Sequence, residues 1–317
     1  MIKKICFSLF VATLVTSCGL SSKVSNHTQT GVSASHIQTT LHYLASDELL
    51  GRDTGKEGNI QAANYLANEL EKYGIQPYFD VYEDRLDEVE NTWNVVGVIP
   101  GQDPALKQEL VVLGAHYDHI GIQPAVKGDS IANGANDNAS GVSILLELAR
   151  NLAQKDVKRT VVVCFFTGEE LGLLGSKHLA NRLKEEEAKV VLMLNFEMLG
   201  VPMQRDYVTF ITGYDQSNLA AKINEIAGEN LAGRFEEAEA MQLFMRSDNY
   251  PFYLAYKIPS QTFSSSDFEN FKYYHHVKDE AHLMDVTFMT ELTKKFVPVV
   301  EKLINLPSGE IRLKNKE

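Results

Sequence analysis

The amino-acid sequence predicts an α/β fold, a three-layer sandwich whose central sheet is mixed but mostly parallel and has helices on both faces. Two observations support this prediction. Near-continuous apolar, β-branched runs predict buried strands at residues 94–99, 109–115, 160–166 and 189–196. Helical patterns alternate with these runs, at residues 140–153 and 172–183. Strands that are apolar on both sides and alternate with helices are typical of a parallel sheet covered on both faces.

The N-terminal segment precedes this fold and predicts export. In residues 1–17, Lys3 and Lys4 come before a short apolar stretch, which is the pattern of a signal peptide. The sequence Val15-Thr16-Ser17-Cys18 resembles the bacterial lipobox, which implies cleavage before Cys18 and attachment of lipid to its sulfur. The resemblance implies a lipoprotein anchored to a membrane of the bacterial cell envelope, and an ordinary secretory signal is the alternative.

Residues 18–34 are rich in Ser, Thr, Asn and Gln and predict a flexible tether ahead of a single domain at residues 35–317. This domain is expected to begin with a helix near Ser35. A second helix is predicted from apolar residues at helical spacing, with Gly74 as its stop. The apolar residues of that helix are Ile60, Ala63, Leu66, Leu70 and Tyr73.

Composition restricts the partners of the chain. The net charge is −12, which argues against nucleic acid, because phosphates require a basic surface. Loss of Cys6 with the signal and acylation of Cys18 would leave Cys164 alone, so no internal disulfide is expected. The aromatic stretch at residues 241–256 is compatible with a lid, a pocket wall or part of the core.

Ionisable side chains stand at the ends of the apolar runs, where a charge is costly unless something compensates it. Ligands gather beyond the carboxyl ends of parallel strands, so these side chains are expected to meet there. They are His116, Asp118, Asp137, Glu169, Glu170, Glu197 and His275. Converging carboxylates and imidazoles are ligands of divalent metals, with Zn²⁺ the leading candidate. The sequence therefore predicts a hydrolase with two metal ions.

Several of these residues also have an ordinary structural explanation. His116 and Asp118 face one side of an extended segment, which would let Asp118 accept the second ring proton of a metal-bound imidazole. Asp137 precedes a helix, so it is either a helix cap or a carboxylate that bridges two cations. Glu169 and Glu170 repel each other. Either one binds metal while the other accepts a proton, or both lie at a solvated helix start.

The motifs that carry these residues show a family resemblance. The ordered set GAHYDH, GANDNASG, GEELGLLGS and Y-H-x(3)-D resembles the zinc aminopeptidases with two co-catalytic metals, the twenty-eighth metallopeptidase family. That family also contains glutamate carboxypeptidases and is related to glutaminyl cyclases. The resemblance runs from LASDELLGRDTG to YHHVKDE and covers most of the chain beyond the tether.

The resemblance implies two Zn²⁺ ions as cofactors. His116 would bind one ion, Glu170 and His275 would bind the other, and Asp137 would bridge them. Glu197 stands where the family usually has an aspartate that completes the shell of the first metal. The extra methylene adds roughly 1.5 Å of reach, so a shifted or weaker first metal is expected.

The resemblance also implies roles for residues that do not bind metal. Glu169 resembles the general base, and Tyr274 matches a residue that steadies the tetrahedral oxyanion in some members. Asp248, in the segment RSDNYPF, resembles a family residue near the substrate site. Asp118 is expected to accept a hydrogen bond from the ring nitrogen of His116 that does not bind metal.

The expected activity is removal of N-terminal residues from peptide substrates by attack of metal-activated water. A glutaminyl cyclase is an alternative. Cyclases carry several tryptophans in and around the pocket, whereas this chain has a single tryptophan, Trp93, far upstream of the paired glutamates. A carboxypeptidase is a third possibility. A binding module with a decayed site is the non-enzymatic alternative, and it is disfavoured because every expected ligand position carries an ionisable group.

Overall fold

The computed structural model of the chain describes residues 31–314. The signal peptide, the lipid attachment at Cys18 and most of the tether lie outside the described residues. The first described residues lead directly into helix α1 (Ala34–Leu44), whose N-terminus is capped by the Ser33 hydroxyl. Helix α2 (Glu57–Lys72) ends just before Gly74, whose φ is +73°, so both predicted N-terminal helices are confirmed.

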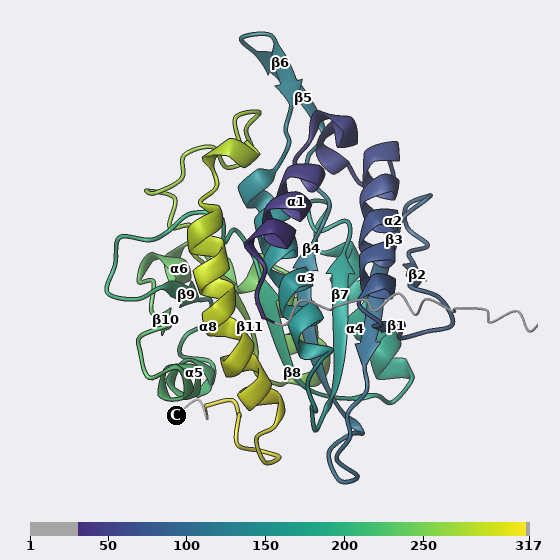
Figure 1. Ribbon diagram of the computed structural model, residues 1–317, viewed down its shortest axis with the longest axis vertical. Coiled ribbons are helices and arrows are strands. Elements are labelled where there is room, and N and C mark those ends of the chain that lie inside the picture. Colours follow the sequence, from purple (N-terminus) through teal and green to yellow (C-terminus); the bar gives the residue numbers. More distant parts are fainter. Residues whose placement is uncertain (1–30, 315–317) are drawn as a thin grey trace, which may run out of the picture. The chain divides into compact units, whose positions relative to one another are not determined.

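The main sheet among residues 31–314 is mixed and has nine strands (Figure 1). Eight follow in the order β1-β3-β7-β4-β8-β11-β9-β10, and β2 pairs with β3. The strands are β1 (Gln76–Pro77), β2 (Glu83–Arg85), β3 (Trp93–Ile99), β4 (Glu109–His116), β7 (Thr160–Phe166), β8 (Lys189–Phe196), β9 (Thr209–Ile211), β10 (Ala232–Gly233) and β11 (Ser260–Ser264).

Parallel pairing dominates the centre of this sheet. Strands β7, β4, β8 and β11 run parallel to one another, whereas β3 is antiparallel to β7 and β9 is antiparallel to β11. All four strands expected from the sequence are present, and the mixed, mostly parallel sheet is confirmed. The carboxyl ends of β4, β7 and β8 therefore lie at one edge, as ligand binding in such sheets requires.

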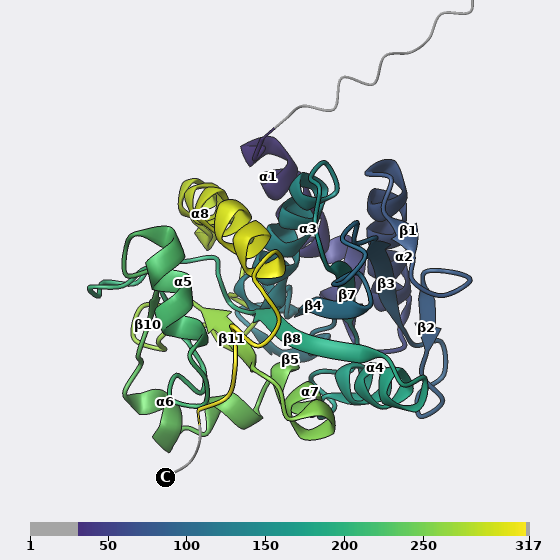
Figure 2. The same cartoon turned by 90° about the horizontal axis from the view of Figure 1, so that it is seen from below.

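Helices cover both faces of the sheet (Figures 1 and 2). One face carries α1, α2, α3, α5 and α8, and the other carries α4 and α7. The helices not yet delimited are α3 (Gly141–Leu152), α4 (Leu174–Glu185), α5 (Leu219–Ala227), α6 (Glu237–Ala240), α7 (Asn249–Tyr256) and α8 (Val286–Ile304). Short helical turns are η1 (Asp47–Arg52), η2 (Ala135–Ser140), η3 (Leu243–Met245) and η4 (Ala281–Leu283).

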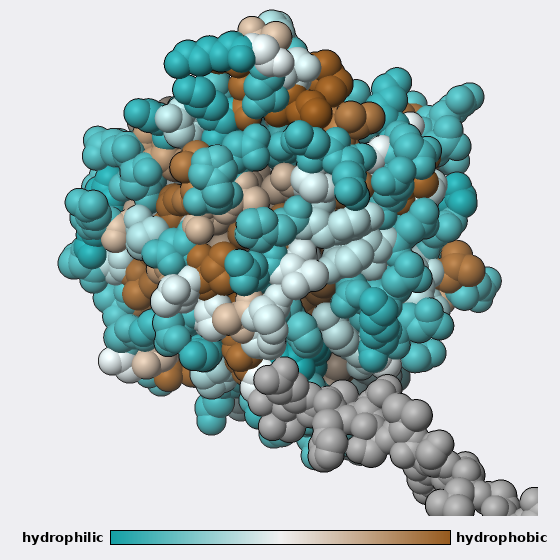
Figure 3. Space-filling view, turned by 45° about the horizontal axis from the view of Figure 1, so that its top comes forward, coloured by the Kyte–Doolittle hydropathy of each residue, from teal (hydrophilic) through white to brown (hydrophobic). Residues whose placement is uncertain are grey.

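The surface of the described residues is largely polar, and hydrophilic residues predominate on the face shown in Figure 3. Large apolar side chains that remain exposed include Leu50, Ile122 and Leu171. None of the helices among residues 31–314 has the length and apolarity needed to cross a membrane. Cys164 is buried and forms no disulfide among the described residues.

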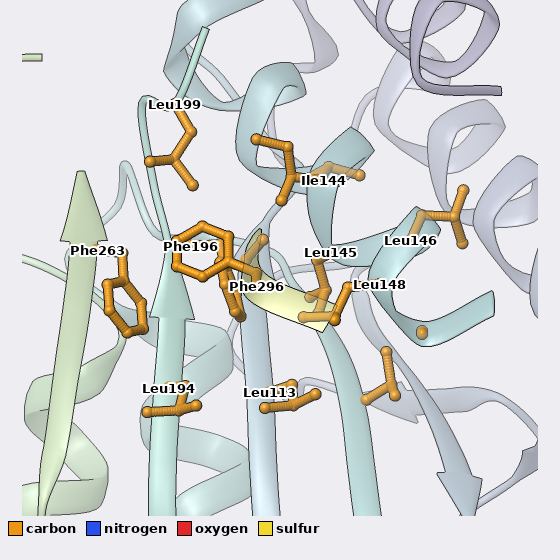
Figure 4. Packing of buried hydrophobic residues seen from close by; sticks show 14 of the residues in the cluster. Leu113, Ile144, Leu145, Leu146, Leu148, Leu194, Phe196, Leu199, Phe263 and Phe296 are labelled. Atoms are coloured by element: carbon orange, nitrogen blue, oxygen red, sulfur yellow. The ribbon is translucent and has the colours of Figure 1, made fainter. Parts of the chain in front are cut away.

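Alternation along the strands builds two separate cores. Val111 and Leu113 of β4 face the α3 and α8 side, whereas Leu110 and Val112 face the α4 and α7 side. In the larger core, the ring of Phe196 lies 5.6 Å from that of Phe263 and 5.3 Å from that of Phe296 (Figure 4). Phe196 is the last residue of β8, so this aromatic packing fixes the strand end that leads into Glu197.

Candidate metal centre

Segments far apart in the chain bring the expected residues to one edge of the sheet. His116 is the last residue of β4 and is in register with Phe166, the last residue of β7. Glu169 and Glu170 follow β7, and Glu197 comes directly after β8 rather than inside it. The Glu pair is not a helix start, because α4 begins only at Leu174.

Asp137 lies between two imidazoles. His116 Nε2 is 3.3 Å from Asp137 Oδ1, and His275 Nε2 is 3.3 Å from Asp137 Oδ2. His275 Nε2 also lies 3.0 Å from Glu170 Oε2. Asp137 is not a helix cap, since the side chain of Asn138 accepts the Gly141 N–H at 3.2 Å. Its two oxygens thus face different histidines, which is the geometry required of a bridging carboxylate.

Electrostatics couples these groups strongly. Burial by itself raises the pKa of Asp137, but hydrogen bonds with His116 and His275 outweigh it and hold that pKa well below its ordinary value. Burial lowers the pKa of His275, whereas hydrogen bonds to Asp137 and Glu170 raise it to about 10. Protons on the imidazoles therefore compensate the carboxylates in the absence of a cation. A metal ion would take over that compensation and displace these protons.

Three further carboxylates are compensated only in part, by attraction to His116. Burial, followed by repulsion from Glu197 and Asp248, raises the pKa of Glu169 well above its usual value. Burial likewise raises the pKa of Glu197 and that of Asp248 to about 7. Neither carboxylate oxygen of Asp248 has a well-formed hydrogen bond among the described residues, and His116 Nε2 faces the Asp137 carboxylate at 3.3 Å. An excess of buried acidic groups around the imidazole of His116 fits a divalent cation.

Asp118 supports this arrangement from behind. It accepts hydrogen bonds from the Thr54 hydroxyl (3.0 Å) and from the backbone N–H groups of Glu169 (3.2 Å) and Glu170 (3.3 Å). His116 Nδ1 lies 3.2 Å from the Asp118 carbonyl oxygen and 3.6 Å from its carboxylate. The nearer partner of the ring is thus the backbone oxygen, while the carboxylate chiefly fixes the Glu pair.

The remaining expected residues lie at the rim of the centre. The Ser247 hydroxyl donates to Glu197 Oε2, so the glutamate is held on one oxygen. The ring of Tyr274 stacks on that of His275 with 3.9 Å between centroids, and 37% of the residue is exposed. Tyr274 and Glu197 line a pocket together with Ser247 and Leu243 from the aromatic stretch. That stretch also buries Phe252 in the core, so it forms both pocket wall and core.

Sequence reasoning missed three contributors. His119 Nδ1 lies 3.0 Å from Glu170 Oε1, although His119 is visible three residues after His116 in GAHYDH. The Asp279 carboxylate accepts the N–H groups of Asn136 (2.7 Å) and Asp137 (3.0 Å) and so holds the bridging loop. Asp279 is the last residue of the motif Y-H-x(3)-D, but the sequence did not indicate this role for it.

The third missed contributor is Arg52, which is fully buried. Its guanidinium donates to the carbonyl oxygens of Tyr117 (2.7 Å), Asn133 (2.6 Å) and Gly134 (2.9 Å). It thereby links the segment of His116 to the segment that leads into Asp137. Burial lowers the pKa of Arg52 to about 10, with nearby acidic groups opposing the shift, and the side chain stays positively charged beside them.

Comparisons with known proteins identify a family for the chain. The model of peptidase family M28 matches residues 94–300. A probable zinc metalloprotease of Leptosphaeria maculans is 30% identical over 63% of this chain and 51% of its own length. A probable leucine aminopeptidase of Trichophyton verrucosum is 27% identical over 91% of this chain and 76% of its own length. The chain spans about half the length of the first of these relatives.

Solved structures share the fold. The Legionella pneumophila LapA aminopeptidase superimposes with a TM-score of 0.69 at 22% identity, covering 87% of this chain and 73% of that one. Glutaminyl cyclase of Bacteroides thetaiotaomicron gives a TM-score of 0.64 at 17% identity, covering 86% of this chain and 98% of that one. Similarity at this level supports the α/β architecture alone.

Proposed function

The chain belongs to peptidase family M28, and from this premise we propose that it is a zinc aminopeptidase that removes N-terminal residues from peptides. The observation that carries the proposal is Asp137, whose two oxygens each face a different imidazole at 3.3 Å. Both similar proteins quoted above bear names that agree with it, zinc metalloprotease and leucine aminopeptidase.

Two Zn²⁺ ions are proposed. His116, Asp137 and Glu197 would hold the first, and Asp137, Glu170 and His275 the second. Bound zinc would supply Lewis acidity, which polarises the scissile carbonyl and lowers the pKa of water. The Ser247 hydroxyl donates a hydrogen bond to Glu197 Oε2, which occupies one of the two carboxylate oxygens. We therefore expect the first ion to be held more weakly than the second.

The residues of the chain carry the proton transfers. Glu169 lies beside the centre with a raised pKa, which suits a group that accepts a proton from water and returns it to the leaving amine. The Tyr274 hydroxyl is protonated at neutral pH, since burial raises its pKa, and it can donate to the developing oxyanion. The acidic surroundings of Glu197 and Asp248 would attract the positively charged N-terminus of a peptide.

The direct test is a panel of N-terminal aminoacyl fluorogenic substrates, assayed with and without a chelator. We expect release of the fluorophore that chelator abolishes and added zinc restores. Glu169→Gln should retain zinc and lose at least about 100-fold in kcat, because general acid–base catalysis contributes that much. Turnover of Glu169→Gln near the wild-type rate would refute the role of Glu169.

A glutaminyl cyclase is the second candidate, because a cyclase is among the similar structures. The paired glutamates are followed by GLLGSKHLA, without the tryptophans that cyclases carry there. A peptide that begins with glutamine would separate the candidates, since a cyclase forms pyroglutamate and a peptidase releases free glutamine. Shortening of a peptide from its other end would instead indicate a carboxypeptidase.

Localisation is proposed from the sequence alone. The lipobox-like sequence before Cys18 supports a lipid anchor in the bacterial cell envelope. Expression in a bacterium with a radiolabelled fatty acid tests this proposal. Label should appear on the wild-type chain and be absent from Cys18→Ser.

A further inference from the structure

A third imidazole enters the centre on one side only. His119 is buried, and its Nδ1 atom lies 3.0 Å from Glu170 Oε1 and 3.8 Å from Asp137 Oδ2. On the same side, His275 Nε2 lies 3.0 Å from Glu170 Oε2 and 3.3 Å from Asp137 Oδ2. Two imidazoles and two carboxylates therefore converge there. Across Asp137, by contrast, His116 is the single imidazole beside Oδ1 among the described residues.

These contacts place both imidazoles on the same two carboxylates, with Glu170 offering Oε1 to His119 and Oε2 to His275. Zinc bonds to nitrogen and oxygen of about 2.0–2.1 Å place the ligand atoms of a tetrahedral site about 3.4 Å apart. The four measured contacts, from 3.0 to 3.8 Å, lie around this value, and Glu170 counts as one ligand although it meets each imidazole with a different oxygen. His119, Asp137 and Glu170 by themselves already form a group of side chains close enough to hold one metal ion. The rings of His119 and His275 meet edge to face, with centroids 5.7 Å apart, so they point at the shared carboxylates rather than stack.

The backbone holds the His119 ring in this orientation. The His119 N–H donates to the Arg52 carbonyl oxygen at 3.3 Å. The ring lies directly against Gly134, where an added Cβ would come within 2.5 Å of a ring carbon. Gly134 also has a φ of +58°, so a residue with a side chain is disfavoured there for two reasons. The absence of a side chain at Gly134 therefore leaves room for the imidazole of His119 beside the segment that carries Asp137.

We propose that His119 is a fourth protein ligand of the second zinc ion, which makes that site closed and leaves the water-activating position on the His116 side. This inference rests on the proposed zinc aminopeptidase function. Sites with four protein ligands are typical of tightly held structural zinc, whereas catalytic zinc keeps one position open. His116, Asp137 and Glu197 supply three ligands and leave that position free.

Cobalt substitution provides a test that does not depend on activity. Paramagnetic NMR of the mature chain loaded with Co²⁺ counts the shifted, exchangeable ring N–H signals, one for each bound histidine. We expect three signals in the wild type and two in His119→Gln. The matched control is His42→Gln, which alters an exposed histidine of α1 and should keep all three. Zinc competition with a chromophoric chelator should show the tighter of two binding steps weakened at least about 10-fold in His119→Gln.

The competing arrangement makes a different prediction. His119 Nε2 has no hydrogen-bond partner among the described residues, so Nδ1 could carry the proton and donate it to Glu170. Two shifted signals in the wild type, unchanged in His119→Gln, would overturn the proposal in favour of that hydrogen bond. The number of shifted signals in the wild type distinguishes the two arrangements even if the variant does not fold. Failure of the wild type to bind any divalent ion would instead refute the proposed function itself.

Discussion

Asp118 connects three parts of the centre through one carboxylate. Its oxygens accept the N–H groups of Glu169 and Glu170 and the hydroxyl of Thr54, while its own carbonyl oxygen lies near His116. These donors are fixed in place. The carboxylate can therefore be replaced only by a group with two atoms that both accept hydrogen bonds. Its contribution is therefore to position the proposed proton acceptor Glu169 relative to the proposed metal ligands.

Asp118→Asn tests this role at the scale of one residue. The amide nitrogen cannot accept a hydrogen bond, so one N–H group of the Glu pair would lose its partner. We expect about a 10- to 100-fold loss in kcat or zinc affinity, the usual effect of changing groups that orient metal ligands. Thr54→Val, which removes one donor and leaves the carboxylate intact, should have a smaller effect in the same assays. Equal effects of the two variants would contradict this account.

At the scale of elements, the proposed metal ligands come from strand ends and from the segments between them. The segment from His119 to Asp137 contains a hairpin of β5 (Ile122–Val126) and β6 (Asp129–Ile131), which projects beyond the sheet edge (Figure 1). These two strands pair with each other in a sheet of their own. The base of the hairpin is closed by the Ala132 N–H, which donates to the Gly121 carbonyl oxygen at 3.0 Å.

The hairpin should therefore be dispensable for the metal centre. Replacing residues 123–130 with Asn-Gly would keep Ile122 opposite Ile131, as they are now, across a two-residue turn. We expect an unchanged zinc content and a change of less than about 1 kcal/mol in unfolding free energy, as for surface changes away from the core. Thermal unfolding and metal analysis measure both. Loss of zinc would show that the hairpin, and not only its base, supports the centre.

At the scale of the whole molecule, the buried acidic groups link stability to pH. Burial raises the pKa of Asp279 to about 6 and those of Glu197 and Asp248 to about 7, whereas the unfolded values are near 4. The folded, metal-free protein thus retains protons that the unfolded chain releases. Its stability must fall as pH rises through this range. His116 and His275, whose pKa values are raised in the folded state, act in the same direction above about pH 6.5.

Zinc should reverse this dependence. Metal binding requires deprotonated ligands, so its stabilising effect grows with pH. Calorimetry at pH 5, 7 and 9 should show the Tm of the metal-free protein decreasing, and the gap between zinc-loaded and metal-free protein widening. A metal-free Tm that increases from pH 5 to pH 9 would contradict the assignment of these buried groups.

The sequence by itself determined the elements and the kinds of ligand. Strands such as β4 and β7 are continuous apolar runs, and helix α2 has apolar residues at helical spacing, so local periodicity sufficed. Charges at the ends of buried strands indicated metal chemistry, because such charges need compensation.

Only the tertiary structure decided which side chains meet and at what distance. His119 contacts Glu170 across 51 positions, and Asp279 holds Asn136 across 143. Arg52 joins loops that carry no periodic pattern of their own. These contacts depend on long-range packing of irregular backbone, and no local pattern of residues records them.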